Sequence, residues 1–230
     1  MKYKESNLYS LVSVEPSYYP AFLNLAGKKT VVIGGGRVAE RKILSLIKAH
    51  AKVKVISPYL TKRLEREKLK GKIKHVCRNY KKGDLTNAFL VITATDSLRI
   101  NEKISHDAPC LVNVVDMPDL CNFIVPSLVK RGHLQFAIST SGMSPAFAKS
   151  IRKELEDIYG LEFSEYLRLL KIIRKRALHE LRDKKKRTEF LKSIASEKII
   201  RMLREKGLKK TKSHLNNLCK KAIERNPKYK

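Results

Sequence analysis

The sequence predicts an α/β fold built on a parallel sheet, and three observations support this prediction. Short β-branched runs alternate with segments of helical hydrophobic period over residues 20–115, as expected where helices connect parallel strands by right-handed crossovers. The first strand runs directly into Gly34, Gly35 and Gly36 before a helix starts. After Asp116 the pattern changes to two adjacent apolar β runs and then to helices alone.

Five strands and three helices are predicted in the first segment from their hydrophobic period. The strand runs are apolar and β-branched, whereas the helices repeat their apolar residues three and four positions apart. The strands are 29–33, 52–56, 72–76, 89–93 and 110–115, and the helices are 38–49, 59–69 and 97–107. This order predicts a Rossmann-like parallel sheet.

The second segment begins with a predicted β-hairpin. Two apolar runs, 123–129 and 134–140, are separated by residues 130–133, which include a glycine. Pro126 lies inside the first run, which favours an edge strand or a bulge because proline has no N–H to donate.

The rest of the chain predicts helices. Ser144 and Pro145 are suited to be the N-cap and first residue of a helix that ends near Gly160. From residue 161 onward the pattern is helical throughout, with breaks near Lys184 and Gly207. It predicts a small helical domain or an extended helical arm.

Composition indicates a globular chain. Its 230 residues are 43% hydrophobic, enough for one large domain or two modest ones. No run approaches the roughly 18–20 apolar residues of a membrane helix, and no apolar region follows Lys2 and Lys4 to make a secretory signal. The four cysteines form no C-x-x-C pair, so we expect reduced thiols and a cytoplasmic protein.

The net charge of +28 is extreme. Residues 151–230 hold 25 Lys and Arg against 11 Asp and Glu, so half of the net charge lies there. Such a field attracts anions, among which nucleic acid, acidic lipid and a polycarboxylate substrate are candidates. The alternative is that the lysines lie on solvated helix faces without a partner.

The glycine turn predicts a dinucleotide site. Gly34 would allow a tight turn, Gly36 would let phosphate approach the backbone, and Ala39 is the third small residue of G-x-G-x-x-G/A. The N–H groups of the following helix would then face the phosphates. An unrelated turn could also produce this pattern. The second strand ends at Ser57 without the usual acidic residue, so Ser57 would bind the ribose and discrimination against NADP is weakened.

Polar residues also follow the fourth and fifth strands, at the edge of the sheet where ligands bind. The segment from Thr93 to Asp96 would contact the cofactor, including Ala94 and Thr95, or Thr95 or Asp96 would instead cap the next helix. Asn113 and Asp116 end the fifth strand, and Asp116 would act as a general base or stabilise a cation. The structural alternative for Asp116 is an Asx-turn before a proline.

A hydroxyl-rich segment, 139–145, precedes the helix that Pro145 begins, and it would bind anionic groups or form only a capped turn. The six histidines show no metal-like spacing, so we expect no metal site. G-x-S-x-G, H-E-x-x-H and P-loop motifs are absent.

Taken together, these segments resemble the N-terminal module of sirohaem synthase, the precorrin-2 dehydrogenase/sirohydrochlorin ferrochelatase family. The resemblance extends over roughly residues 18–160 in the family's order. The matching pieces are VVIGGGRVAERK from Val31, VISP at 55–58, ITATD at 92–96, NVVDMPDLCNFIVPS at 113–127 and ISTSGMSPAFAKSIRKELE at 138–156.

The resemblance implies an NAD-dependent oxidoreductase that converts precorrin-2 to sirohydrochlorin, and some members also insert ferrous iron. It implies a homodimer joined through the hairpin 123–140, and a catalytic role for Asp116. The cofactor would be bound by Gly34, Gly35, Gly36, Arg37, Val38, Ser57, Pro58, Tyr59, Thr93, Ala94, Thr95 and Asn113, and the tetrapyrrole by Ser139, Ser141 and Ser144.

Pattern and resemblance together predict four parts of the chain. They are a lead-in over 1–19, an NAD-binding domain over 20–115, a dimerisation and substrate-cleft region over 116–146, and a basic helical domain over 147–230.

The sequence departs from many relatives at two positions. Met117 stands where they have a second aspartate after Asp116, and Asn122 stands where many have aspartate. Fewer carboxylates favour oxidation alone over iron insertion.

Two rival functions remain. One is a dinucleotide-sensing regulator that binds nucleic acid through basic helices 161–225, although no helix-turn-helix or RNA-binding motif supports it. The other is a carrier that delivers tetrapyrrole without chemistry. The enzyme is our main prediction, with no nucleic-acid or membrane partner expected.

Overall fold

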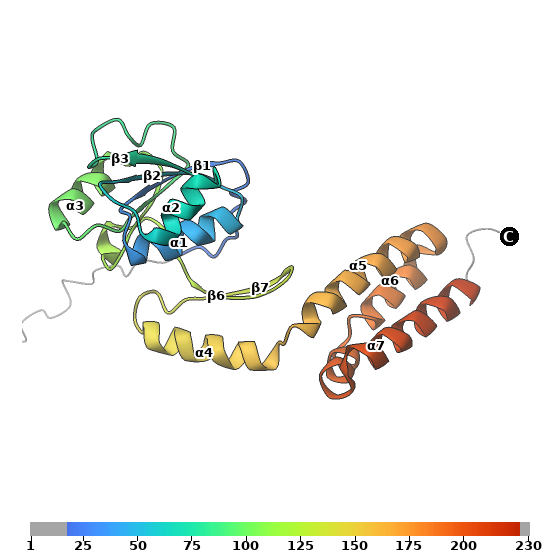
Figure 1. The fold of residues 1–230 in the computed structure, drawn as a ribbon. Coiled ribbons are helices and arrows are strands. Elements are labelled where there is room, and N and C mark those ends of the chain that lie inside the picture. The colour runs from blue at the N-terminus through green and yellow to red at the C-terminus, as the bar shows by residue number, and fades with distance from the viewer. Residues whose placement is uncertain (1–17, 226–230) are drawn as a thin grey trace, which may run out of the picture. The chain divides into compact units, whose positions relative to one another are not determined.

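The computed structural model describes residues 18–225, so most of the lead-in predicted over 1–19 lies outside the described residues. The chain divides between Val125 and Pro126 into two compact units (Figure 1). This single division falls inside the region 116–146 that we predicted as one part. Residues 116–125 fold with the sheet, because their backbone and side chains bond to its last strand.

The first unit holds a five-stranded parallel sheet, as predicted. Its order is β3-β2-β1-β4-β5. Ile33 at the end of β1 pairs with Ile56 on one side and Thr93 on the other, so neighbouring strands end at the same level. The strands are β1 (Lys29–Ile33), β2 (Lys52–Ser57), β3 (Ile73–Cys77), β4 (Leu90–Thr93) and β5 (Leu111–Val114).

Helices cover both faces of this sheet. Successive β1 residues point to opposite faces, so Val32 packs beneath Ile43 of α1 (Arg37–Lys48) and Leu64 of α2 (Lys62–Leu69). Val31 packs on the other face with Ile104 of α3 (Leu98–Asp107). The sheet is therefore a doubly covered layer whose strand ends are free to form a site (Figure 1).

The helix boundaries of this unit lie within one residue of the prediction, except for the start of the second helix. The second helix was expected over 59–69, but α2 begins at Lys62. Thr61 is its N-cap, and the Thr61 side chain accepts a hydrogen bond from the Leu64 N–H at 3.3 Å. The preceding residues are thereby left extended at the end of β2, where they line the pocket described below.

The second unit begins with an antiparallel hairpin of β6 (Ser127–Arg131) and β7 (Leu134–Ile138). The prediction that its first strand begins at residue 123 was wrong. The backbone N–H of Asn122 donates to Val112 O of β5 at 3.1 Å, so this stretch belongs to the sheet edge. Pro126 lies just before β6 and not inside it.

Helices complete the second unit. Ser144 caps α4 (Pro145–Ile158), as predicted, by accepting the Phe147 N–H at 3.2 Å. The predicted breaks are present: α6 begins at Lys184, and Gly207 has φ 72° inside α7. An additional break after α6 was not predicted. The remaining helices are α5 (Glu162–Glu180), α6 (Lys184–Ser193) and α7 (Glu197–Arg225).

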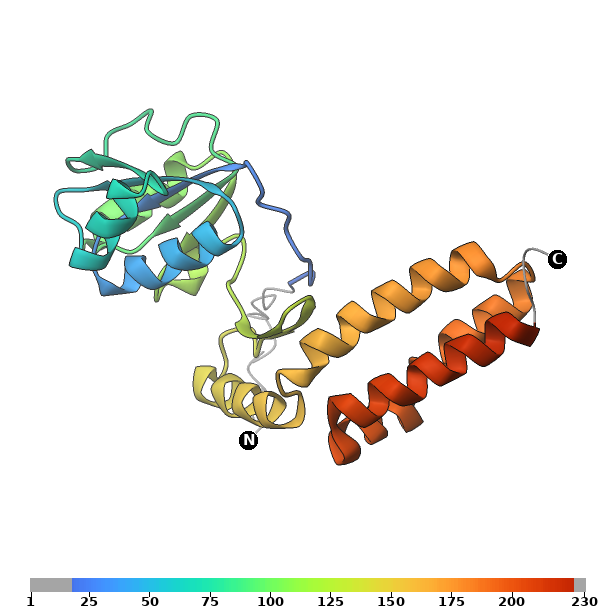
Figure 2. The ribbon, with the colours of Figure 1, turned by 45° about the vertical axis from the view of Figure 1, so that its right-hand side comes forward.

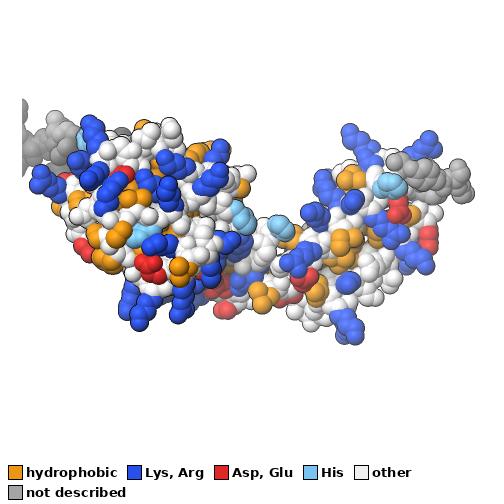
Figure 3. Space-filling view, turned by 45° about the horizontal axis from the view of Figure 1, so that its top comes forward, with side chains coloured by type: hydrophobic (Ala, Val, Ile, Leu, Met, Phe, Trp, Pro, Cys, Tyr) orange, Lys and Arg blue, Asp and Glu red, His pale blue; other side chains and the backbone are white. Residues whose placement is uncertain are grey.

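The helices α5, α6 and α7 lie side by side and share one core (Figure 2). Phe163, Tyr166 and Ile173 of α5 pack against Leu203 and Leu215 of α7. Basic side chains lie on the outside of both units on the face shown in Figure 3. Within residues 18–225, no helix combines the length and the apolar character of a membrane span.

Candidate functional site

The glycine turn after β1 packs tightly against neighbouring backbone. Gly34 has φ +116°, and a Cβ there would lie 2.3 Å from Ala94 O. A Cβ on Gly35 would lie 2.0 Å from Tyr59 O. Both positions therefore exclude a side chain by packing, and Gly34 does so by its backbone conformation as well.

Gly36 is different, because its missing side chain leaves open space. The nearest atom to a Cβ there would be Tyr59 Oη, 3.9 Å away. Gly36 is the N-cap of α1 and supplies no side-chain cap, so the first N–H groups of that helix remain available to an anion. Such a space in front of free N–H groups fits the pyrophosphate of a dinucleotide.

A pocket of about 470 Å³ opens in front of this turn. It is bounded by the residues that follow β1, β2, β3 and β4, as expected for ligands of an open α/β sheet. Ten of the predicted cofactor residues line it, namely Gly34, Gly35, Gly36, Arg37, Val38, Ser57, Pro58, Tyr59, Ala94 and Thr95. Asp96, which the sequence offered for cofactor contact or helix capping, also lines it, and the lining that sequence reasoning missed includes Asn79, Tyr80, Ser97 and Ile100.

Asn79 and Tyr80 could have been found by the same rule as the others, because they follow the end of β3. The Tyr80 hydroxyl donates to Asp107 Oδ2 at 2.8 Å, and burial together with this bond raises the pKa of Tyr80. Tyr80 is therefore a neutral, fixed wall of the pocket.

Ser57 ends β2 with its side chain almost fully buried. Its hydroxyl donates to Tyr59 O at 2.6 Å, and His75 Nε2 lies 2.9 Å from Ser57 O. That contact requires a proton on Nε2. Nδ1 is buried and has no hydrogen-bond partner among the described residues. These contacts fix the turn 57–59 along the pocket wall.

Thr93 and Thr95 are positioned by a side chain that sequence reasoning missed. Both hydroxyls donate to Asn101 Oδ1 at 2.7 Å, and Asn101 Nδ2 donates to Thr95 O at 3.0 Å. Thr93 is fully buried and does not line the pocket, whereas Thr95 does. Neither Thr95 nor Asp96 caps α3, whose N-cap is Ser97.

Asp116 lies two residues beyond the end of β5, exposed, in the left-handed region with φ 60°. Cys121 holds this loop closed: its sulfur accepts the Val114 N–H at 3.1 Å and lies 3.3 Å from Met117 O. Asn113 is buried, and its Nδ2 donates to Phe123 O at 3.2 Å. Asn113 thus contacts the loop and not the pocket.

The end of β5, two residues before Asp116, lies at the same edge of the sheet as the glycine turn, but Asp116 does not line the pocket. Ile33, Thr93 and Val114 are opposite one another on three adjacent strands. Strands are about 4.8 Å apart, so the β5 end is about 10 Å from the β1 end across the same edge.

Lys42 is a further charged group near this loop that the sequence did not single out. It is half-buried on α1, and burial, followed by the nearby charge of Arg41, lowers the pKa of Lys42. Asp116 and Cys121 act in the opposite direction. Lys42 and Asp116 therefore interact electrostatically.

The predicted substrate residues Ser139, Ser141 and Ser144 form one turn at the start of α4. Ser139 Oγ accepts the Ser141 N–H at 3.0 Å, and Ser141 has φ 52°. Ser139 and Ser141 are exposed, whereas Ser144 is half-buried and occupied as the helix cap. The turn presents hydroxyls to solvent within the second unit.

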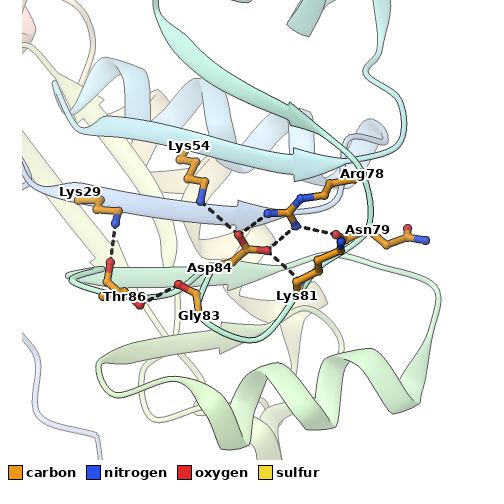
Figure 4. A network of polar contacts seen from close by, with 8 residues as sticks. All are labelled: Lys29, Lys54, Arg78, Asn79, Lys81, Gly83, Asp84 and Thr86. Carbon is orange, nitrogen blue, oxygen red and sulfur yellow. Dashed lines mark hydrogen bonds and ion pairs between the residues drawn. The ribbon is translucent and has the colours of Figure 1, made fainter.

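A second polar network holds the segment between β3 and β4 (Figure 4). Asp84 is buried and accepts two bonds from Arg78, at 2.7 and 2.8 Å, and one from the Lys81 N–H at 2.9 Å. Lys54 of β2 approaches within 3.4 Å. These contacts, the hydrogen bonds from Arg78 above all, lower the pKa of Asp84 well below its usual range. The network anchors the segment that carries Asn79 and Tyr80.

Among residues 18–225, no group of three His, Cys, Asp or Glu side chains is arranged to hold a metal ion. Each of the four cysteines is a free thiol.

Two family models match the chain. Residues 21–127 match a family described as "Putative NAD(P)-binding", and residues 131–158 match "Sirohaem biosynthesis protein central". The two matches are consecutive and reach from the sheet through the hairpin to the end of α4. The chain belongs to the family of the sirohaem synthase N-terminal module.

Curated siroheme synthases are similar in sequence to this chain, in agreement with the family models. The siroheme synthase of Thioalkalivibrio sulfidiphilus is 36% identical over 176 residues, which are 75% of this chain and 36% of the relative. That of Nitrosococcus oceani is 42% identical over 144 residues, or 61% of this chain and 31% of the relative. The chain therefore spans about a third of the length of these family members.

A solved structure of SirC, a precorrin-2 dehydrogenase, has the same fold. It superposes with a TM-score of 0.75 at 25% identity, covering 87% of this chain and all of SirC. The Rossmann-like sheet, the hairpin and the C-terminal helices predicted from the sequence are therefore the architecture of this family.

Proposed function

We propose that this chain oxidises precorrin-2 to sirohydrochlorin with NAD⁺ as hydride acceptor. The observation that carries this proposal is the position of Asp116, an exposed carboxylate at the edge where a glycine turn leaves space for a dinucleotide. The family match supplies the substrate class.

Different residues of the pocket would bind different parts of the cofactor. The N–H groups at the start of α1 and the open space at Gly36 would hold the pyrophosphate. The turn 57–59 would lie by the adenosine ribose, and Ala94 and Thr95 by the nicotinamide. Bound NAD⁺ supplies the hydride acceptor.

The role of Asp116 is to accept a proton. Oxidation of precorrin-2 removes a hydride and a proton from the macrocycle: NAD⁺ would accept the hydride, and the Asp116 carboxylate would accept the proton. The products are sirohydrochlorin, NADH and a proton that Asp116 then releases to water. The Asp116 carboxylate is exposed and lies near the half-buried Lys42, so it is accessible to a bound substrate.

Electrostatics suits this substrate, because precorrin-2 carries eight carboxylates and the chain has a net charge of +28. The hydroxyls of Ser139, Ser141 and Ser144 would hydrogen-bond some of these groups. We further propose a homodimer through the β6–β7 hairpin, supported by the exposed apolar side chain of Leu128 in β6 (45% exposed). Four free thiols support a cytoplasmic location.

The decisive experiment is Asp116→Asn, assayed with precorrin-2 and NAD⁺ by NADH absorbance and the appearance of sirohydrochlorin. We expect the rate to fall by about 100-fold or more, with NAD⁺ affinity within about twofold of the unmodified chain. The matched control is Asp119→Asn, an exposed carboxylate three residues along. Full activity of Asp116→Asn would show that the carboxylate is not the base.

Iron insertion is tested in the same assay by adding ferrous iron to the product. We propose oxidation alone, because Met117 and Asn122 stand where many relatives have further carboxylates. Sirohaem formation above the rate without protein would contradict this.

The alternative, a regulator that binds nucleic acid, is favoured only by the charge of helices α5 to α7. It predicts binding to duplex DNA or RNA whose affinity falls steeply with salt. The regulator is excluded if no specific complex with nucleic acid forms and if the chain still produces NADH at saturating nucleic acid.

A further inference from the structure

A second pocket lies beside the nucleotide pocket. It has a volume of about 630 Å³ and lies between the first turns of α1 and α2. The two pockets share Arg37. The backbone N–H of Thr61 donates to Gly35 O at 3.1 Å, which ties the start of α2 to the glycine turn. Both pockets therefore belong to one rigid part of the sheet unit.

The second pocket is strongly cationic. Arg37, Arg41, Lys62 and Arg63 line it, with Glu40 as the one carboxylate and Thr61 as the remaining neutral residue. Glu40 accepts a hydrogen bond from the Thr61 hydroxyl and lies 4.0 Å from Arg63, so its charge is already engaged.

Three of these cations have no counter-ion. Across the described range 18–225, Arg37, Arg41 and Lys62 take part in no ion pair. All three are exposed and gathered around one hollow. Like charges held this closely repel one another, and an anion bound among them would relieve that repulsion.

The end of β2, in the neighbouring nucleotide pocket, indicates which anion would bind among these cations. Dinucleotide folds that select NAD place a carboxylate at the end of the second strand to bind the ribose 2′-hydroxyl, whereas those for NADP have an arginine nearby. Here β2 ends at Ser57, without a carboxylate. The cations begin only a few residues later, at Lys62 and Arg63.

We propose that the pocket lined by Arg37, Arg41, Lys62 and Arg63 binds the 2′-phosphate of NADP⁺, so that the chain accepts NADP⁺ as well as NAD⁺. This inference rests on the proposed function only in that the dinucleotide occupies the glycine-turn pocket. It assigns Lys62 and Arg63 as specificity-determining residues.

The test is calorimetric titration at one fixed ionic strength with NAD⁺, NADP⁺, 2′,5′-ADP, AMP and inorganic phosphate. We expect 2′,5′-ADP to bind at least about tenfold more tightly than AMP. In the double variant Lys62→Gln/Arg63→Gln, the ratio of NADP⁺ to NAD⁺ affinity should fall at least about tenfold. The matched control is Arg66→Gln, an exposed arginine on the same helix outside the pocket, which should leave that ratio unchanged.

Three outcomes would overturn the inference. In the first, NAD⁺ binds but 2′,5′-ADP binds no more tightly than AMP. In the second, the double variant and Arg66→Gln change the ratio equally, which shows a general effect of charge. In the third, inorganic phosphate binds in a manner that depends on Lys62 and Arg63 while the dinucleotide ratio does not move. Failure of both dinucleotides to bind would instead refute the proposed function itself, and this inference with it.

Discussion

Asn101 of α3 accepts hydrogen bonds from Thr93 and Thr95 with the same side-chain oxygen, each at 2.7 Å. Thr93 is fully buried and Asn101 is 5% exposed, so the contact is shielded from water. Through it the end of β4 is held in the conformation in which Ala94 and Thr95 line the nucleotide pocket. A residue outside the predicted site thus sets the shape of one of its walls.

Replacing Asn101 with leucine should therefore affect both stability and binding. The variant leaves the buried Thr93 hydroxyl without an acceptor, which costs about 2 kcal/mol of unfolding free energy. It also releases the Thr95 carbonyl, so NAD⁺ affinity should fall several-fold. Urea denaturation and NAD⁺ titration measure the two effects. Glu102→Leu, an exposed neighbour on α3, is the control, and equal stabilities of the two variants would contradict the argument.

Gly36 and Gly35 should respond differently to alanine. A Cβ at Gly36 enters open space, so Gly36→Ala should keep the melting temperature and lose more than about tenfold in nucleotide affinity. A Cβ at Gly35 overlaps Tyr59 O, so Gly35→Ala should cost about 1–3 kcal/mol of stability. Thermal melts with and without NAD⁺ separate the two cases. Normal nucleotide binding by Gly36→Ala would mean that no phosphate approaches this residue.

Asp84 should make the first unit sensitive to acid. Its bonds to Arg78, followed by the Lys81 N–H and the charge of Lys54, hold the pKa of Asp84 below its unfolded value. Such a group contributes stability above the unfolded pKa of about 3.9, and this contribution is lost as the pH falls toward the folded pKa.

Asp84→Asn should accordingly lower the melting temperature by about 5 °C at neutral pH. The difference from the unmodified chain should close as the pH falls below about 4. Melts over this range measure it, and Asp119→Asn, an exposed aspartate, serves as control. A difference that stays constant to about pH 3 would show that the ion pair is not its source.

The sheet and the glycine turn were predictable because they depend on local pattern. The first strand, 29–33, is found with the predicted bounds, since a β-branched run stops abruptly at Gly34. The wall formed by 57–59 follows from the rule that ligands bind at strand ends. These features need only the order of strands and helices, and hydrophobic period reveals that order.

The polar networks were not predictable, because their partners are distant in sequence. Lys54 and Asp84 are 30 residues apart and meet only when the strands are assembled. Asn101 lies in a helical pattern where a polar residue indicates a solvated face, although it is buried. The hairpin was predicted to start too early for a similar reason. Residues 122 and 123 bond to β5, which is about ten residues away in sequence, and not to the second strand of the hairpin.

Asn122 provides the last prediction. Its Oδ1 accepts the Val112 N–H at 2.7 Å and its Nδ2 donates to Cys110 O at 2.9 Å, so it pairs with β5 much as another strand would. In Asn122→Asp, a carboxylate oxygen would face Cys110 O, and two acceptors would meet without a proton.

The variant should lose about 0.5–1.5 kcal/mol of unfolding free energy at neutral pH, the net contribution of a hydrogen bond at an exposed side chain. A protonated carboxyl can donate to Cys110 O as the amide does, so the folded state raises the pKa of the introduced aspartate above its unfolded value. The loss should therefore be present at neutral pH and shrink as the pH falls through that raised pKa. Denaturation at neutral and acidic pH checks this, with Asn122→Ala as a variant whose loss should not depend on pH. Equal pH dependence of the two variants would show that repulsion at Cys110 O is not responsible.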